Sequence, residues 1–403
     1  MSRILVTDGE ERSALAVTRS LGRAGHEVHV AASTPKPLAA ASKHAAGQHR
    51  VPSPLEEPRA FVEAVAASAR REEAAVVLPV TDPSALAVLE HRALLDGVQV
   101  PLPSLPSFRA ASDKAQVAEL ARRAGLAAPA YQLVPDRGTA ERIDVTHVPL
   151  PVVVKGATSV AGDGSSRWMS RVAYASTPDA LRQVLSGIPA DGFPVLLQER
   201  VQGAGMGIFL LLWDGELLAH FGHRRIREKP PTGGVSVLRE SVPVESELLA
   251  AATNLLRGLG WRGVAMVELK VDAASGRPYV LEVNGRFWGS LQLAWDAGVD
   301  FPRLLVDAAL GRPLEPLKTY RPGVRSRWLW GDTDHLFIRL KNGADPCNGL
   351  GSRIWSAGRA LGAYMAAFRP GTKCEILRVR DPGPFVRESH QRIQAVTGRR
   401  GRR

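Results

Sequence analysis

Apolar runs and stretches of helical spacing alternate over the first hundred residues. Residues 3–7 form a short apolar run, residues 13–24 have helical spacing, and residues 27–31 and 75–79 are apolar again. This order is typical of a parallel sheet that carries helices on both faces. No G-x-G-x-x-G follows the first run, which argues against a dinucleotide site. We predict a doubly wound N-terminal α/β domain over residues 1–108, ending in a proline-rich stretch.

Two β-rich runs further along the chain, AMVELKV and PYVLEVN, predict a hairpin around the polar segment 272–277. A turn near Ser275 places Glu268 opposite Glu282, with Asn284 two residues further on the same face. Like charges about 5 Å apart call for a shared proton or a bound cation. Carboxylate and amide oxygens suit Mg²⁺. The alternative is a surface hairpin whose acidic side chains are merely solvated.

Basic residues supply a second group of candidates. Arg286 directly follows the hairpin, and its forked donors suit phosphate or carboxylate. Four cations precede a Pro-Pro and Gly-Gly segment: Arg224, Arg225, Arg227 and Lys229. They predict a glycine-closed basic loop that holds an anion, although such runs are more often solvated faces.

A small-residue segment follows the apolar run that ends in Lys155. It contains Gly162, Gly164 and Ser165, and glycines let backbone N–H groups approach phosphate oxygens closely. It is not a Walker motif, because no G-K-[ST] closes it. A flexible surface loop is the alternative interpretation.

Composition and charge limit the class of protein. A chain of 403 residues with 45% hydrophobic residues is long enough for two or three domains. No apolar run reaches the roughly 18 residues of a membrane span, and the first residues lack a signal-peptide pattern, so we expect a cytoplasmic protein without a membrane partner. Cys347 and Cys374 have no ligand-spaced partners, which argues against a disulfide framework or a cysteine zinc site.

The positive charge is concentrated near the C-terminus. Residues 321–403 contain 17 Lys/Arg and 6 Asp/Glu, so nearly all of the net charge of +12 lies there. The final GRRGRR has no aromatic residues for base stacking, and we expect a solubilising end and no nucleic-acid partner.

The hairpin, together with the motifs before it, resembles the ATP-grasp superfamily, whose members use ATP to join a carboxylate to an amine. The supporting motifs are S-D-K at 112–114, G-L-A-A-P at 125–129, the glycine-rich segment and Q-E-R-V at 198–201. The resemblance covers about residues 1–315. It implies an ATP-grasp domain over 109–315 with a mobile lid lobe near 155–200, followed by a basic extension over 316–403.

The resemblance also implies residue roles. ATP would contact Lys114, Lys155, Gly162, Gly164, Ser165, Gln198, Glu199 and Val201. Mg²⁺ ions, two in the family and with Mn²⁺ as an alternative, would be held by Glu268, Glu282 and Asn284. Arg286, Arg225 and Arg227 would bind the transferred phosphoryl group and the substrate carboxylate, with His223 as a weak candidate base. The acid that often binds ribose in the family is replaced by Gly205 and Met206.

The expected reaction is Mg-dependent activation of a carboxylate as an acyl phosphate, followed by attack of an amine. The resemblance leaves three alternatives open: a carbamoyl-phosphate-synthase-like enzyme, a carboxylase-like enzyme and a non-catalytic ATP-binding regulator. It also allows a homodimer. The substrates themselves are small molecules that the sequence does not name.

Overall fold

The computed structural model describes residues 1–163, 166–342 and 350–400. Its first unit is a four-stranded parallel sheet in the order β3-β2-β1-β4. The strands are β1 (Arg3–Val6), β2 (Glu27–Ala32), β3 (Gly47–Arg50) and β4 (Val76–Leu78). Helix α1 (Arg12–Arg23) lies on one face of this sheet, and α2 (Pro58–Arg71) and α3 (Asp82–Glu90) lie on the other.

Alternating side chains in the parallel sheet explain the two covered faces. Ile4 and Val6 pack in one core with α1, whereas Leu5 packs in another with α2. Successive residues of a strand point to opposite faces, so an uninterrupted apolar run marks a strand that is buried on both sides. The predicted doubly wound N-terminal sheet is confirmed.

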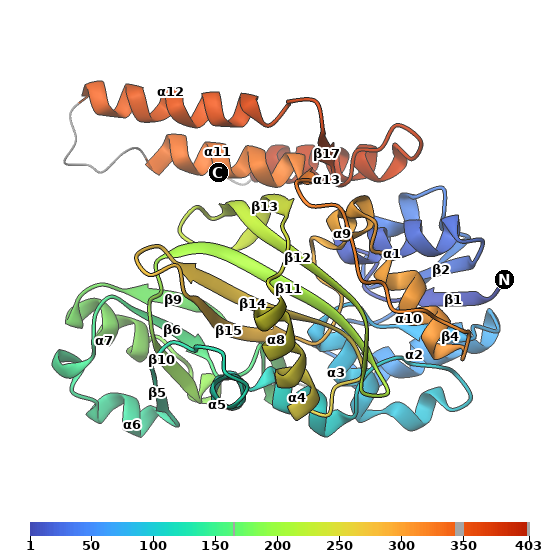
Figure 1. Ribbon diagram of the computed structural model, residues 1–403, viewed down its shortest axis with the longest axis horizontal. Coiled ribbons are helices and arrows are strands. Elements are labelled where there is room, and N and C mark those ends of the chain that lie inside the picture. Colours follow the sequence, from blue (N-terminus) through green and yellow to red (C-terminus); the bar gives the residue numbers. More distant parts are fainter. Residues whose placement is uncertain (164–165, 343–349, 401–403) are drawn as a thin grey trace.

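The second unit is a small lobe built on an antiparallel sheet in the order β5-β10-β6-β9. Its strands are β5 (Tyr131–Val134), β6 (Val152–Gly156), β9 (Val172–Ala175) and β10 (Val195–Glu199). Helices α6 (Arg137–Arg142) and α7 (Pro178–Ser186) pack on it, and β7 (Val160–Asp163) pairs with β8 (Ser166–Met169) as a separate hairpin. Figure 1 shows this lobe in green, on the side of the molecule opposite the N-terminal sheet.

The third unit is a seven-stranded sheet in the order β15-β14-β11-β12-β13-β16-β17. Its strands are β11 (Gly203–Trp213), β12 (Glu216–Lys229), β13 (Val235–Ser241), β14 (Gly263–Asp272), β15 (Pro278–Asn284), β16 (Arg325–Arg327) and β17 (Thr372–Cys374). One face packs on α4 (Leu105–Ser112), α5 (Lys114–Arg123) and α8 (Ser246–Gly258). The other packs on α9 (Leu291–Ala297) and α10 (Phe301–Ala309), and its core continues into the N-terminal sheet.

The last segment contributes helices α11 (Leu329–Asn342), α12 (Leu350–Ala366) and α13 (Gly383–Arg400), which lie along one edge of the molecule in Figure 1. Its strands β16 and β17 belong to the large sheet, where β16 pairs with β13 and β17 pairs with β16. Buried ion pairs join it to distant elements: Arg19 to Asp381 at 2.7 Å, and Arg239 to Glu375. The boundary at residue 315 stays a prediction.

Among the helices of the described residues, none combines the length and the apolar character that crossing a bilayer requires.

Candidate active site

The hairpin of β14 and β15 has the predicted register. Glu268 lies opposite Glu282, and Met266 lies opposite Asn284. The side-chain amide of Asn284 donates to Glu282 Oε1 at 3.1 Å. All three polar residues line a cavity of about 330 Å³, which we call the hairpin cavity. Two carboxylates and an amide carbonyl are hard oxygen donors, and this set fits Mg²⁺.

Two lysines approach the hairpin from different elements. Lys114 follows the N-cap Asp113 of α5 and places Nζ 3.9 Å from Glu282 Oε2. Lys155 lies on β6 and donates to the backbone oxygen of Leu281 at 3.3 Å. Burial, with help from the charge of Lys114, lowers the pKa of Lys155 to about 8. Burial also works against ionisation of Glu282, but the two lysines, together with Asn284 and Arg286, outweigh it and lower the pKa of that carboxyl.

Arg225 closes the other side of the carboxylate pair. Its Nη2 lies 2.6 Å from Glu268 Oε2, and its Nη1 donates to Glu228 at 3.2 Å. Burial raises the pKa of Glu268, and the neighbouring Glu282 adds to this, while Arg225 opposes it. The two facing carboxyls therefore differ: Glu282 is held ionised by lysines, and Glu268 depends on one arginine.

Arg286 is positioned by both the hairpin and the N-terminal domain. It donates from Nη2 to Asn284 Oδ1 at 2.8 Å and from Nε to Asp82 Oδ2 at 3.2 Å. Asp82 begins α3, directly after the N-cap Thr81, whose side chain accepts from the Ser84 N–H in a capping box. Thr81 thus caps the helix, whereas Asp82 orients an arginine that lies 204 residues away in the chain.

Arg12 was not identified from the sequence, although it lines the hairpin cavity. It begins α1, lies over the Trp328 ring at 4.1 Å, and donates to Glu375 at 2.7 Å. Both partners come from the last quarter of the chain, so no local pattern could indicate that Arg12 faces the hairpin.

His223 also lies in the cavity wall, at hydrogen-bond distance from Ser290 (Nδ1 to Oγ, 3.3 Å). Burial, together with Arg225 and Arg239, lowers its pKa well below the ordinary value. A histidine with such a low pKa is neutral at pH 7 and a weak proton acceptor.

The residues predicted to bind the nucleotide lie mainly in the small lobe. Gln198 and Val201 are buried at the end of β10, and Glu199 accepts a long hydrogen bond from the Ala130 N–H (3.4 Å). Gly162 lies on β7 with φ +83°, a conformation that suits glycine. The predicted contacts Gly164 and Ser165 lie outside the described residues.

The basic run at 224–229 is a strand, and the expectation of a loop there is wrong. These residues belong to β12, which pairs with β13 through irregular register at Arg225 to Glu228. Pairing with neighbouring strands satisfies the backbone hydrogen bonds of this segment. The chain turns only after the strand, at the Pro-Pro and Gly-Gly residues. Arg224 pairs with Glu240 at 2.5 Å, and Lys229 pairs with Asp334 at 2.5 Å.

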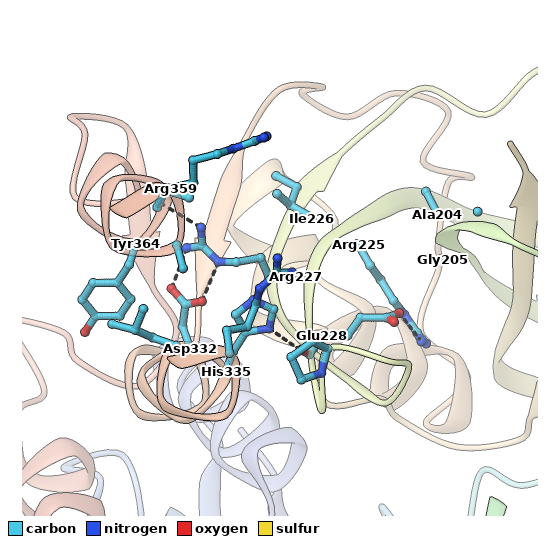
Figure 2. Close-up of a pocket in the computed structure, with 16 residues that line it drawn as sticks. Ala204, Gly205, Arg225, Ile226, Arg227, Glu228, Asp332, His335, Arg359 and Tyr364 are labelled. Carbon is cyan, nitrogen blue, oxygen red and sulfur yellow. Dashed lines mark hydrogen bonds and ion pairs between the residues drawn. The ribbon is translucent and has the colours of Figure 1, made fainter. Parts of the chain in front are cut away.

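Arg227 is not among the residues that line the hairpin cavity. It lines a neighbouring cavity of about 620 Å³ between β12 and helices α11 and α12, which we call the C-terminal cavity. Figure 2 shows its guanidinium facing Asp332 of α11, with both N–H···O contacts at 2.6 Å. A third bond goes to the backbone oxygen of Ala363 at 2.9 Å. Arg225 lines both cavities and lies between them.

Comparison with known proteins shows what this arrangement is similar to. Residues 193–331 match the family described as ATP-grasp in the biosynthetic pathway with Ter operon. A search of curated protein sequences found no match. Solved structures share the fold at low sequence identity.

Three of these structures illustrate the likeness. A biotin carboxylase complex from Campylobacter jejuni is 16% identical with a TM-score of 0.62, covering 80% of this chain and 74% of its own. An L-amino acid ligase from Bacillus licheniformis is 18% identical with a TM-score of 0.60, covering 78% and 75%. An N5-carboxyaminoimidazole synthetase from Staphylococcus aureus, complexed with ADP, is 12% identical with a TM-score of 0.59, covering 78% of each chain. Over residues 193–331 the chain is therefore similar in sequence to this ATP-grasp family, and it shares the fold of these solved structures.

Proposed function

We propose that the protein is an ATP-dependent ligase that activates a substrate carboxylate as an acyl phosphate and joins it to an amine. The observation that carries the proposal is the facing pair Glu268 and Glu282 in a cavity that is also lined by three cations, Arg12, Arg225 and Arg286. The printed names of an L-amino acid ligase and an N5-carboxyaminoimidazole synthetase among proteins of the same fold support a ligase.

Glu268, Glu282 and Asn284 would hold Mg²⁺ in this proposal, because their oxygens are grouped on one face of the hairpin. A structure of the same fold contains Mg-ADP and bicarbonate, which agrees with a metal nucleotide as the substrate form. When bound, the ion would neutralise the negative charge of the phosphates. The proposal includes two such ions, with Mn²⁺ as an alternative to Mg²⁺.

The lysines and the small lobe would hold the nucleotide. Lys114 lies beyond hydrogen-bond distance of Glu282, which leaves its N–H donors available to a phosphate oxygen. Lys155 is buried and close to the same carboxylate, so its charge adds to the same site. Gln198, Glu199 and Val201 would contact adenine at the end of β10.

Arg286 would orient the reacting groups. In the first step a substrate carboxylate oxygen forms a bond to the γ-phosphorus of ATP, and the bond to the β-phosphate oxygen breaks to release ADP. In the second step the amine nitrogen bonds to the acyl carbon, phosphate leaves, and the amine loses a proton. Arg286 and Arg225 carry fixed positive charge to the cavity in which the phosphoryl group would move, and preorganised charge of this kind is a main source of catalysis.

The deciding experiment measures ADP and phosphate release with Mg-ATP over pairs of carboxylates and amines. Wild type is compared with Glu282→Gln and with a control, Glu247→Gln, which changes an exposed acid on α8. Release that requires both substrates and disappears only in Glu282→Gln is expected. Release with bicarbonate alone would favour the carboxylase-like alternative, to which the biotin carboxylase fold lends support. Absence of Mg-ATP binding in the wild type would contradict the proposal.

A further inference from the structure

A second group of metal-ligand side chains lies in the N-terminal parallel sheet, outside the hairpin cavity. His29 is on β2, His49 is on the neighbouring strand β3, and Glu72 is the C-cap of α2. One ligand atom from each lies within 4.8 Å of the others. The side chains of His29 and His49 are only 9% and 8% exposed, so the group is shielded from solvent.

The distances within this group match those between two ligands of one metal ion. Glu72 Oε2 is 3.5 Å from His29 Nε2, and Glu72 Oε1 is 3.4 Å from His49 Nε2. Bonds of about 2.0–2.1 Å in a tetrahedron place neighbouring ligand atoms about 3.3 Å apart. A direct N–H···O hydrogen bond would bring the atoms to about 2.7–3.2 Å. The observed separations therefore fit a shared ion better than direct hydrogen bonds.

Outside the group, His29 Nε2 has one hydrogen-bond partner, Glu27 Oε1 at 3.0 Å. His49 Nε2 is buried and has no hydrogen-bond partner. Within residues 1–163, 166–342 and 350–400, no Lys or Arg lies within ion-pair distance of Glu72, whose carboxylate faces the two histidines. A carboxylate and an unpaired imidazole nitrogen that face one another leave a place for a cation.

Two neighbouring features favour a cation at the same place. Glu27 Oε1, the hydrogen-bond partner of His29 Nε2, is a further carboxylate oxygen beside the group, although Arg3 also contacts Glu27, at 3.4 Å. Glu72 follows the last turn of α2, where the carbonyl groups give the helix its negative end. At Gly47 of β3, a Cβ would lie 2.9 Å from His29 Nδ1, so glycine leaves room for the imidazole ring.

We propose that His29, His49 and Glu72 bind one Zn²⁺, with Glu27 as the nearest oxygen for the fourth position. Two imidazole nitrogens and carboxylate oxygens are ordinary zinc ligands, and zinc accepts tetrahedral coordination readily. The ion joins the edge strand β3 and the inner strand β2 to the end of α2. It is a structural site, separate from the reaction proposed above.

The test uses the full chain, freed of metal with a chelator and titrated with Zn²⁺ against a chromophoric competitor. Excess Mg²⁺ is present throughout to occupy the acidic hairpin. The variants His49→Gln and Glu72→Gln are compared with His147→Gln, which changes a histidine that is 85% exposed in the small lobe. Co²⁺ replaces Zn²⁺ in a parallel experiment on the wild type, because tetrahedral cobalt absorbs visible light far more strongly than octahedral cobalt.

We expect wild type and His147→Gln to bind one Zn²⁺ per chain and to gain thermal stability from it. Each of the other two variants should bind about 10–100-fold more weakly and lose the stabilisation. Equal zinc binding by wild type and Glu72→Gln, or a weak octahedral cobalt spectrum in the wild type, would overturn the proposal. The cobalt spectrum decides the matter even if His49→Gln fails to fold.

Discussion

The hairpin cavity and the C-terminal cavity share Arg225 but differ in how their charges are paired. In the C-terminal cavity, Arg227 makes two contacts of 2.6 Å with Asp332, which also pairs with Arg327 at 2.6 Å. In the hairpin cavity, Arg225 also pairs closely with Glu268, at 2.6 Å, but Lys114 stands 3.9 Å from the facing Glu282, too far for a direct hydrogen bond.

The contrast separates two uses of charged side chains. A carboxylate already saturated by arginines fixes the packing of a helix on a sheet, whereas charges held apart can admit a ligand. Arginine number alone is therefore a poor guide to an active site. Four variants test this division, and they are ordered from the largest expected effect to the smallest.

Asp332→Ala should have the largest effect, and it should be on stability. Asp332 is fully buried, so its loss leaves Arg227 and Arg327 without their carboxylate. Removing one partner of a buried ion pair typically costs about 3–5 kcal/mol. We expect a large fall in the free energy of unfolding, measured by urea denaturation, with Mg-ATP affinity retained by the folded fraction. A fully stable variant with weakened Mg-ATP binding would reverse the roles given to the two cavities.

Glu282→Gln should instead act on turnover and leave the fold intact. The change removes one negative charge from the hairpin cavity while preserving the shape of the side chain. We expect ATP-dependent phosphate release to fall about 100–1,000-fold, a loss comparable to that of one preorganised electrostatic contact. Thermal unfolding serves as the control and should change little. Unaltered turnover in this variant would remove the central residue of the proposed metal site.

Asp82→Asn should have a smaller effect, through the orientation of Arg286. The asparagine keeps an oxygen for the 3.2 Å contact from Arg286 Nε but loses the charge. We expect about a tenfold fall in kcat/KM, because the arginine is held less firmly. Thr81→Ala is the matched control, since it removes the α3 cap at a cost of about 1 kcal/mol in stability. If both variants lower kcat/KM equally, the effect belongs to the helix and not to Arg286.

Glu388→Gln should have the smallest effect, a change in how stability depends on pH. Burial raises the pKa of Glu388 to about 6, partly offset by a hydrogen bond from Trp328 Nε1 at 2.6 Å. The folded chain therefore binds more protons than the unfolded chain between pH 4.5 and 6, so this carboxyl makes stability fall as pH rises through that window.

The glutamine variant should lack this decline in stability. Its unfolding free energy, relative to wild type, should improve from pH 4.5 to 6, and Mg-ATP binding should show no matching change. Parallel pH curves for the two proteins would show that Glu388 does not titrate in this range.

Local patterns predicted the parts of the site that lie close together in the chain. The opposition of Glu268 and Glu282 follows from a short turn and the two-residue period of strands, and the structure has this register. The N-terminal parallel sheet follows in the same way from alternating apolar runs and helical spacing. Residue type alone was a poor guide at Arg227, which was predicted to bind an anionic substrate group. A run of cations along the chain does not indicate that the carboxylate of Asp332 will face it.

The sequence by itself thus determined the elements, the hairpin register and the grouping of oxygen donors, since these depend on neighbours within one turn or one strand pair. Only the tertiary structure decided that Asp82 holds Arg286, that Arg12 enters the hairpin cavity, and that Asp332 takes Arg227 away from it. It also decided that His29, His49 and Glu72 converge. These contacts join separate elements, and the packing of sheets and helices sets their distances, which no periodicity along the chain records.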